Sequence, residues 1–185
     1  MMDEHCRVSH VTAAAYILAY PPIFGGLMRG NESVLQQLNS ALSAELTAIA
    51  QYMVQAETCQ NWGYVRLGAL MKKRAIEEMH HAEHLIERIV YLDAVPKVDV
   101  ALMPKLGNSV IEQLQADLAD EKDAVSNYNA AMTICSEASD NGSRELFKAL
   151  LLDEENHADF LEAQLTAIEQ MGIQNFLAQQ LRPES

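Results

Sequence analysis

The sequence has little positive charge, glycine or proline. Its 185 residues include 13 Lys and Arg against 26 Asp and Glu, which gives a formal net charge of −13. Such an acidic balance argues against a nucleic acid or an anionic membrane as partner, and it suits a protein that attracts cations. Eight Gly, five Pro and 49% hydrophobic residues exclude a disordered or collagen-like chain. A chain of this length is expected to form one domain with its own core.

Cysteine is also sparse. Cys6, Cys59 and Cys135 lie far apart and form no C-x-x-C pair, which excludes a zinc ribbon, a rubredoxin-type site and a C-x-x-C-H haem attachment. So few cysteines indicate a reducing compartment, and we expect a cytoplasmic protein. No apolar run reaches the roughly 18 residues of a membrane span, so we expect no membrane partner.

The first 27 residues differ in character from the rest. Their apolar stretch, residues 12–27, is interrupted by a Pro-Pro and a Gly-Gly pair, and the residues before it carry Asp3 and Glu4 against Arg7 alone. This is a poor positively charged region for a signal peptide. We interpret residues 1–27 as a leader that is disordered or not native, and residues 28–185 as the folded domain. An unusual targeting segment is the alternative interpretation.

From residue 31 onward the apolar residues recur at helical spacing. Leu38, Leu42, Ile49 and Tyr52 share one helix face with Glu45. The pattern predicts helices over residues 32–61, 64–92, 109–137 and 143–171, and a short one over residues 174–181. The connector, residues 93–107, can span roughly 50 Å when extended, enough to cross a bundle lengthwise. The expected fold is all-α: a ferritin-like four-helix bundle with a long crossover between its second and third helices and a short C-terminal fifth helix.

Two E-x-x-H pairs carry the chemical signal. Glu78 precedes His81 by three positions, and Glu154 precedes His157 by three, which places each pair on one helix face. Glu45 precedes Glu78 by the same interval as Glu121 precedes Glu154, so the second hairpin repeats the first. The number of positions from Glu45 to Glu121 is the repeat offset, the shift along the sequence at which the second hairpin repeats the first. Tyr128 follows Tyr52 by the same offset. Each hairpin therefore supplies one Glu and one E-x-x-H pair.

These acids lie on apolar stripes, where an ionised carboxylate costs several kcal/mol unless it is paired or bound to metal. Two divalent cations would neutralise four Glu, while both histidines enter neutral. The set is typical of di-iron and di-manganese carboxylate bundles, and the absence of thiolate ligands favours iron or manganese over zinc. The expected reaction is oxidation of Fe²⁺ by O₂ or H₂O₂, a ferroxidase activity.

The sequence resembles the bacterioferritins, a haem-containing ferritin family, from residue 28 to about residue 182. The resemblance lies in A-E-L-T-A-I-A-Q-Y (44–52), E-E-M-H-H-A-E (77–83), D-E-E-N-H-A-D-F-L-E (153–162) and M-G-I-Q-N-F-L (171–177). It implies an iron store, with dimers assembling into a 24-subunit cage and a ferroxidase centre that holds two iron ions in each subunit. It also implies a role for each ligand: terminal Glu45 and Glu121, bridging Glu78 and Glu154, and the histidines His81 and His157.

Met79 follows Glu78 directly, so it lies about 100° round the helix and faces away from the metal ligands. The resemblance implies that Met79 ligates a haem b iron shared between two subunits. Packing is the alternative role, because Met fills gaps in helical interfaces well. A ferredoxin-type reductant for iron release belongs to the same expectation.

One stretch departs from the family pattern. Lys72, Lys73 and Arg74 stand where many members carry acidic and histidine residues, which weakens the case for an extra iron site on the inner surface. Arg74 lies one turn before Glu78, and we expect the two to pair. Tyr52 lies two turns after Glu45, within reach of a metal ligand.

Two other functions remain open. One is a haem-binding or structural cage subunit that partners a second, active bacterioferritin subunit. The six intact ligands and Met79 argue against it. The other is a di-iron peroxidase of the rubrerythrin type, which usually adds a further Glu and a rubredoxin tail. No C-x-x-C pair is present for such a tail.

Overall fold

The computed structural model describes residues 29–98 and 103–181; the leader expected over residues 1–27 lies outside them. The described residues form five helices and no strand, as the sequence predicted. They are α2 (Glu32–Asn61), α3 (Val65–Tyr91), α4 (Val110–Glu137), α5 (Asn141–Met171) and the short α6 (Ile173–Ala178). Within these ranges no helix is both long enough and apolar enough to span a bilayer.

Side-chain caps set where three of the helices begin. The side chains of Asn31, Ser109 and Asp140 accept hydrogen bonds from backbone N–H groups in the first turns of α2, α4 and α5, which satisfies donors that have no partner within the helix. Because Asp140 is the cap, α5 begins at Asn141, two positions before the predicted start. Gly172 has a φ of 80°, a left-handed conformation that breaks the helix, and α6 then runs over 173–178 rather than the predicted 174–181.

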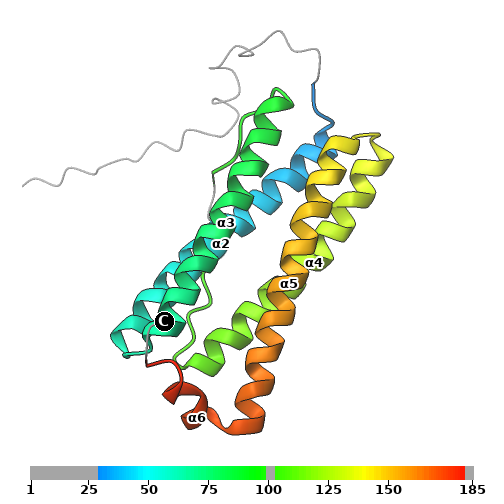
Figure 1. The fold of residues 1–185 in the computed structure, drawn as a ribbon. Helices are drawn as coiled ribbons and strands as arrows, with labels where there is room; N and C mark the ends of the chain where they lie inside the picture. Colours follow the sequence, from blue (N-terminus) through cyan, green and yellow to red (C-terminus); the bar gives the residue numbers. More distant parts are fainter. Residues whose placement is uncertain (1–28, 99–102, 182–185) are drawn as a thin grey trace, which may run out of the picture.

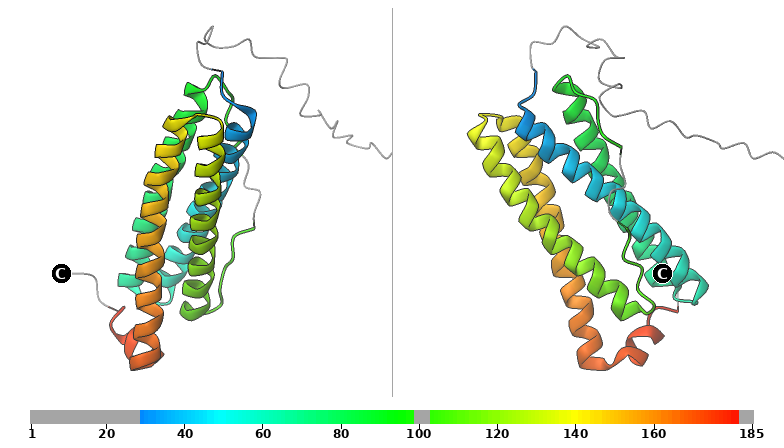
Figure 2. Two further views of the ribbon diagram at one scale, coloured as in Figure 1. Left: turned by 90° about the vertical axis from the view of Figure 1, so that its right-hand side faces the viewer. Right: turned by 180° about the vertical axis from the view of Figure 1, so that it is seen from behind.

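The four long helices form two antiparallel hairpins that lie side by side, α2 with α3 and α4 with α5 (Figure 1). The two views of Figure 2 show that α4 lies next to α2. The crossover follows α2, because Lys97 N donates to Asn39 Oδ1 at 2.7 Å and Lys105 N donates to Gln51 Oε1 at 2.6 Å. The crossover thus brings the chain from the end of α3 to the far end of the bundle, where α4 begins.

The core consists of two apolar clusters along the bundle axis. The first surrounds Leu38, Leu85 and Phe147, and the second surrounds Leu67, Met71 and Leu114. Between them lies a layer of buried polar residues. Burying a Leu or Phe side chain contributes about 1.5–3 kcal/mol, so the two clusters can stabilise a bundle that carries charged groups at its centre.

We expect Arg88→Ala to lower the free energy of unfolding by about 2 kcal/mol. Arg88 joins α3 to the turn before α5: its Nη2 lies 2.5 Å from Asp140 Oδ1, and its Nε donates to Ser143 Oγ at 2.9 Å. Gly142 leaves room for this guanidinium, since a Cβ there would lie 2.6 Å from Nη2. Chemical denaturation measures the effect. The control is Arg144→Ala, which removes an exposed pair with Glu145 and should cost less than about 0.5 kcal/mol. Equal losses in both variants would contradict the role of Arg88.

Candidate metal centre

The six predicted ligands meet in the polar layer at the middle of the bundle. Each helix of the four contributes: α2 supplies Glu45, α3 supplies Glu78 and His81, α4 supplies Glu121, and α5 supplies Glu154 and His157. All six side chains are buried, with between 1% and 6% of their surface exposed. Their ligand atoms form two overlapping groups of four, and within each group the atoms lie within 4.8 Å of one another.

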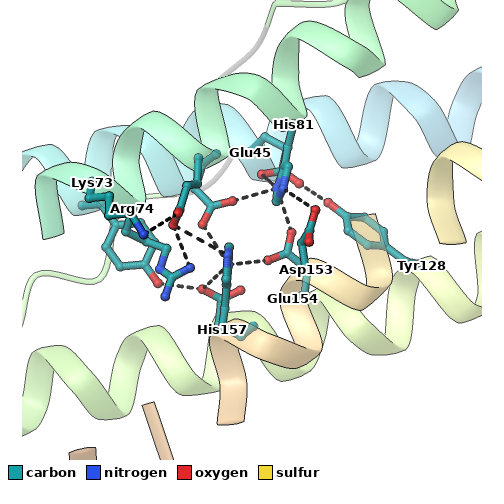
Figure 3. A network of polar contacts seen from close by, with 12 residues as sticks. Glu45, Lys73, Arg74, His81, Tyr128, Asp153, Glu154 and His157 are labelled. Atoms are coloured by element: carbon teal, nitrogen blue, oxygen red, sulfur yellow. Dashed lines mark hydrogen bonds and ion pairs between the residues drawn. The ribbon is translucent and has the colours of Figure 1, made fainter. Parts of the chain in front are cut away.

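Two of the carboxylates connect the two groups. Glu78 places one oxygen 3.0 Å from His81 Nδ1 and the other 3.3 Å from His157 Nδ1. Glu154 does the same, with one oxygen 3.2 Å from His81 Nδ1 and the other 2.9 Å from His157 Nδ1. Figure 3 shows His81 of α3 and Glu154 and His157 of α5 pointing toward one another. The arrangement has the geometry of two carboxylates lying between two histidines.

The other two carboxylates each belong to one side. Glu45 lies 3.7 Å from His81 Nδ1, and Glu121 lies 3.7 Å from His157 Nδ1. A tyrosine of the opposite hairpin holds each of them: Tyr128 donates to Glu45, and Tyr52 donates to Glu121 at 2.6 Å. The sequence predicted that Tyr52 lies within reach of a metal ligand, and the structure shows that this ligand is Glu121 of the other hairpin. The cause is the packing of α2 against α4.

The donor set fits metal ions. Four of the buried polar atoms without a hydrogen bond lie here: Glu78 Oε1, His81 Nδ1, Glu154 Oε2 and His157 Nδ1. Both Nδ1 atoms approach carboxylate oxygens closely, but without the angles of a hydrogen bond. Unpaired buried polar atoms cost about 1–3 kcal/mol each, and a cation between a nitrogen and the oxygens removes this cost. Carboxylate and imidazole ligands suit iron or manganese.

Protons balance the charge of the metal-free centre. Burial alone would lower the pKa of both histidines, but the neighbouring carboxylates outweigh it: those of Glu154, Glu45 and Glu78 raise the pKa of His81 well above its ordinary value, and those around His157 raise its pKa to about 11. Burial raises the pKa of Glu45 and of Glu121 to about 8.

The two central carboxylates behave in the opposite way. Burial would raise the pKa of Glu154, but the nearby histidines lower it to about 2. The same histidines lower the pKa of Glu78 against the effect of burial. Glu78 and Glu154 therefore stay ionised between two protonated histidines, so the layer is electrically neutral near pH 7.

Two carboxylates beside the centre were missed by the sequence analysis. Asp153 Oδ2 lies 3.5 Å from His81 Nε2, and Glu77 Oε2 lies 3.9 Å from His157 Nε2. A carboxylate at the outer nitrogen of a ligating histidine helps to fix the tautomer and the ring orientation. Glu77 and Asp153 are themselves related by the repeat offset, so the internal repeat could have identified them.

The basic stretch before Glu78 is oriented differently from the prediction. Arg74 pairs with Glu77 rather than with Glu78, at 2.9 Å between Nη1 and Oε2, and Lys73 Nζ lies 3.1 Å from the other oxygen of Glu77. Glu78 points into the bundle, whereas Glu77 lies about 100° further round the helix, where both cations reach it. The two cations hold Glu77 beside His157.

Met79 does not join the buried cluster. It lies on the outward face of α3 with 41% of its surface exposed, near the exposed Ile76. This is the side on which the sequence placed it.

A cavity of about 710 Å³ adjoins the centre. It lies between α2, α4 and the crossover, and its lining includes Glu45, Glu121 and Glu154 together with the crossover residues Lys97 and Lys105. The buried carboxylates therefore face a cavity on one side of the bundle.

Comparison with known proteins agrees with this geometry. Residues 35–171 match the family model described as a ferritin-like domain. The chain is 40% identical to a bacterioferritin of Brucella melitensis over 149 residues, which cover 80% of this chain and 92% of the relative. It is 38% identical to a bacterioferritin of Rhodobacter capsulatus over the same shares. It is 36% identical to bacterioferritin BfrA of Mycobacterium tuberculosis over 82% of this chain and 96% of the relative.

Proposed function

The chain belongs to the bacterioferritin family of ferritin-like proteins, and on this basis we propose that it stores iron and oxidises Fe²⁺ to Fe³⁺ with O₂ or H₂O₂. In this proposal each subunit holds two iron ions at one ferroxidase centre, and ferric mineral is deposited in a cage of 24 subunits. The observation that carries the proposal is the placement of Glu78 and Glu154, each of which offers one oxygen to each histidine side.

Each residue of the metal centre would have its own role. Glu45 with His81, and Glu121 with His157, would each hold one metal ion, while Glu78 and Glu154 would bridge the two. When bound, two iron ions supply two electrons to the oxidant. Tyr128 and Tyr52 would hold the terminal carboxylates in position, and the adjoining cavity would admit Fe²⁺ and the oxidant. The excess of acidic residues would attract Fe²⁺ to the assembled protein.

The intact ligand set favours this function over that of an inactive partner subunit. A structural subunit has no need of six buried ligands, and their burial without metal leaves polar atoms unpaired. The bacterioferritin relatives likewise favour an iron store over a peroxidase of the rubrerythrin type.

A titration of the metal-free protein with Fe²⁺ in air tests the proposal. Stopped-flow absorbance should show a fast phase of oxidation that saturates near two Fe²⁺ per chain. A protein that is folded but shows no fast phase would contradict the proposed ferroxidase centre.

We also propose that Met79 ligates haem b at a site shared by two subunits. The donor fits this role, since a thioether can bind haem iron and Met79 lies outward on α3, one turn from the exposed Ile76. Met79→Leu should abolish haem binding, measured as haem absorbance per chain after reconstitution, because Leu keeps the volume but lacks the sulfur. Fe²⁺ oxidation should be unchanged. The control is Met171→Leu, which makes the same change at another exposed methionine and should leave the haem content unchanged. Full haem content in Met79→Leu would disprove the assignment of Met79 as the haem ligand.

A further inference from the structure

A second buried polar group lies between α2 and α4, beside the metal centre. Asp117 has 1% of its surface exposed, and Gln55 is fully buried. Gln55 Nε2 donates to Asp117 Oδ1 at 2.7 Å, and Gln51 Nε2 donates to the same oxygen at 2.9 Å. The other two oxygens, Asp117 Oδ2 and Gln55 Oε1, are buried and have no hydrogen-bond partner. Each side chain therefore has one satisfied and one unsatisfied end.

One proton would satisfy both oxygens. Oδ2 and Oε1 are both acceptors, so they cannot hydrogen-bond to each other while Asp117 is ionised. When protonated, Asp117 Oδ2 can donate a hydrogen bond to Gln55 Oε1. Together with the 2.7 Å hydrogen bond from Gln55 Nε2 to Asp117 Oδ1, it forms an acid–amide pair joined by two hydrogen bonds. Burial supports this state, because it raises the pKa of Asp117 to about 7 against the opposing hydrogen bonds of the two glutamines. The titratable or charged groups around Asp117 are Tyr52 and Cys59 on α2, Arg74 on α3, Lys105 on the crossover, and Asp120 and Glu121 on α4.

The internal repeat shows that the bundle does not need this pair for packing. At the repeat offset, Asp117 corresponds to Ala41 and Gln55 corresponds to Ala131. Both alanines are buried in the apolar cluster around Leu38, so the other half of the bundle has no polar pair at the equivalent place. The metal ligands and the two tyrosines do repeat. The acid–amide pair therefore exists on one side of the centre only, the side of Glu121.

Asp117 lies on a path from Glu121 to the surface. Tyr52 donates to Glu121, and one cavity is lined by Gln51, Tyr52, Asp117, Asp120 and Glu121. Gln51 also donates to Asp120 at 3.0 Å, and the Lys105 ammonium group donates to the other oxygen of Asp120. Lys105 is more than half exposed. The outer end of the path is thus open to solvent.

We propose that Asp117, paired with Gln55, carries protons between the Glu121 side of the metal centre and the solvent at Asp120 and Lys105. The inference rests on the proposed function, because metal binding requires ionised carboxylates and neutral imidazoles and so expels protons from the buried centre. Asp117 gives its proton across the cavity to the Asp120 carboxylate, which passes it to solvent, and it takes one from the centre. It begins and ends the transfer protonated, so the proton count balances.

Infrared spectroscopy tests the protonation of Asp117. In protein loaded with Zn²⁺, a redox-inactive probe, the metal-bound glutamates are ionised, and the C=O band of one carboxylic acid should remain at pH 6, below the pKa of Asp117. Asp117→Asn should remove this band and keep the fold, because the Asn amide can donate to Gln55 Oε1. Asp159→Asn, at an exposed position on α5, is the matched control and should keep the band. Absence of the band in the unsubstituted protein would overturn the proposal and point to a cation at these oxygens.

The rate of proton release tests the transfer. Stopped-flow mixing of metal-free protein with Zn²⁺ and a pH indicator should show proton release slowed by about tenfold in Asp117→Asn, with Zn²⁺ stoichiometry unchanged. Equal rates in Asp117→Asn and Asp159→Asn would overturn the proposal.

Should Asp117→Asn fail to fold, Gln55→Leu serves instead. This variant keeps the carboxylic acid of Asp117 but removes the acceptor of its hydrogen bond, so the infrared band should shift. An unmoved band would count against the acid–amide pair. Failure of the unsubstituted protein to bind two Zn²⁺ would instead refute the proposed metal centre.

Discussion

Replacing Glu154 with alanine should slow the fast phase of Fe²⁺ oxidation by at least about 100-fold. Loss of a residue that only supports a metal ligand already costs about 10–100-fold in affinity or activity, and Glu154 lies within 3.2 Å of both histidines of the centre. The variant removes both carboxylate oxygens, one of which is offered to each proposed metal ion. It also removes a negative charge that helps to balance the positive charge of the metal ions. Stopped-flow oxidation of Fe²⁺ by the metal-free protein measures the rate.

The next residue provides the control for this experiment. Glu155 lies on the same helix and is exposed, so Glu155→Ala makes the same chemical change outside the centre and should leave the rate unaltered. Far-UV circular dichroism should show the same helix content in both variants, because two apolar clusters flank the polar layer. Equal oxidation rates in the two variants would show that Glu154 does not belong to the proposed centre.

Loading of the metal-free protein with two Zn²⁺ ions should release about four protons per chain at pH 7. Two come from the histidines, because both pKa values lie far above 7. The other two come from Glu45 and Glu121, because burial raises both pKa values to about 8. Glu78 and Glu154 release none, since their pKa values are lowered. Four protons exchanged for two divalent cations leave the charge of the layer unchanged.

The sign of the pH dependence follows from these pKa values. Glu45 and Glu121 lose their protons as the pH rises through about 8, whereas His157 keeps its proton to about 11. The number released should therefore fall from about four at pH 7 to about two near pH 9.5. Isothermal calorimetry in two buffers of different ionisation enthalpy gives the number. Glu45→Gln should release about one proton fewer than the unsubstituted protein at pH 7. The control variant Glu155→Ala should release as many protons as the unsubstituted protein. A value near zero at pH 7 would show that the centre is not held neutral by protons.

Much of the molecule could be predicted from the sequence because the signals are local. Helical periodicity and caps such as Ser109 depend on residues within a few positions of one another, and the E-x-x-H spacing fixes two side chains on one face of the same helix. The internal repeat then identified Glu45 and Glu121 as the matching acids in the partner helices. Helix ends were less well predicted: the cap at Asp140 starts α5 two positions early, and α6 runs over 173–178 rather than 174–181.

The sequence by itself thus determined the helices, the bundle and the candidate ligands, and the tertiary structure decided what each side chain touches. Tyr52 bonds to Glu121 of the other hairpin, and Arg74 turns to Glu77 rather than Glu78. Asp117 and Gln55 are far apart in the sequence and meet only because α2 packs against α4. Periodicity gives the face of a helix on which a residue lies. The axial offset and rotation of one helix against another depend on the packing of all four, and they select the hydrogen-bond partner within that face.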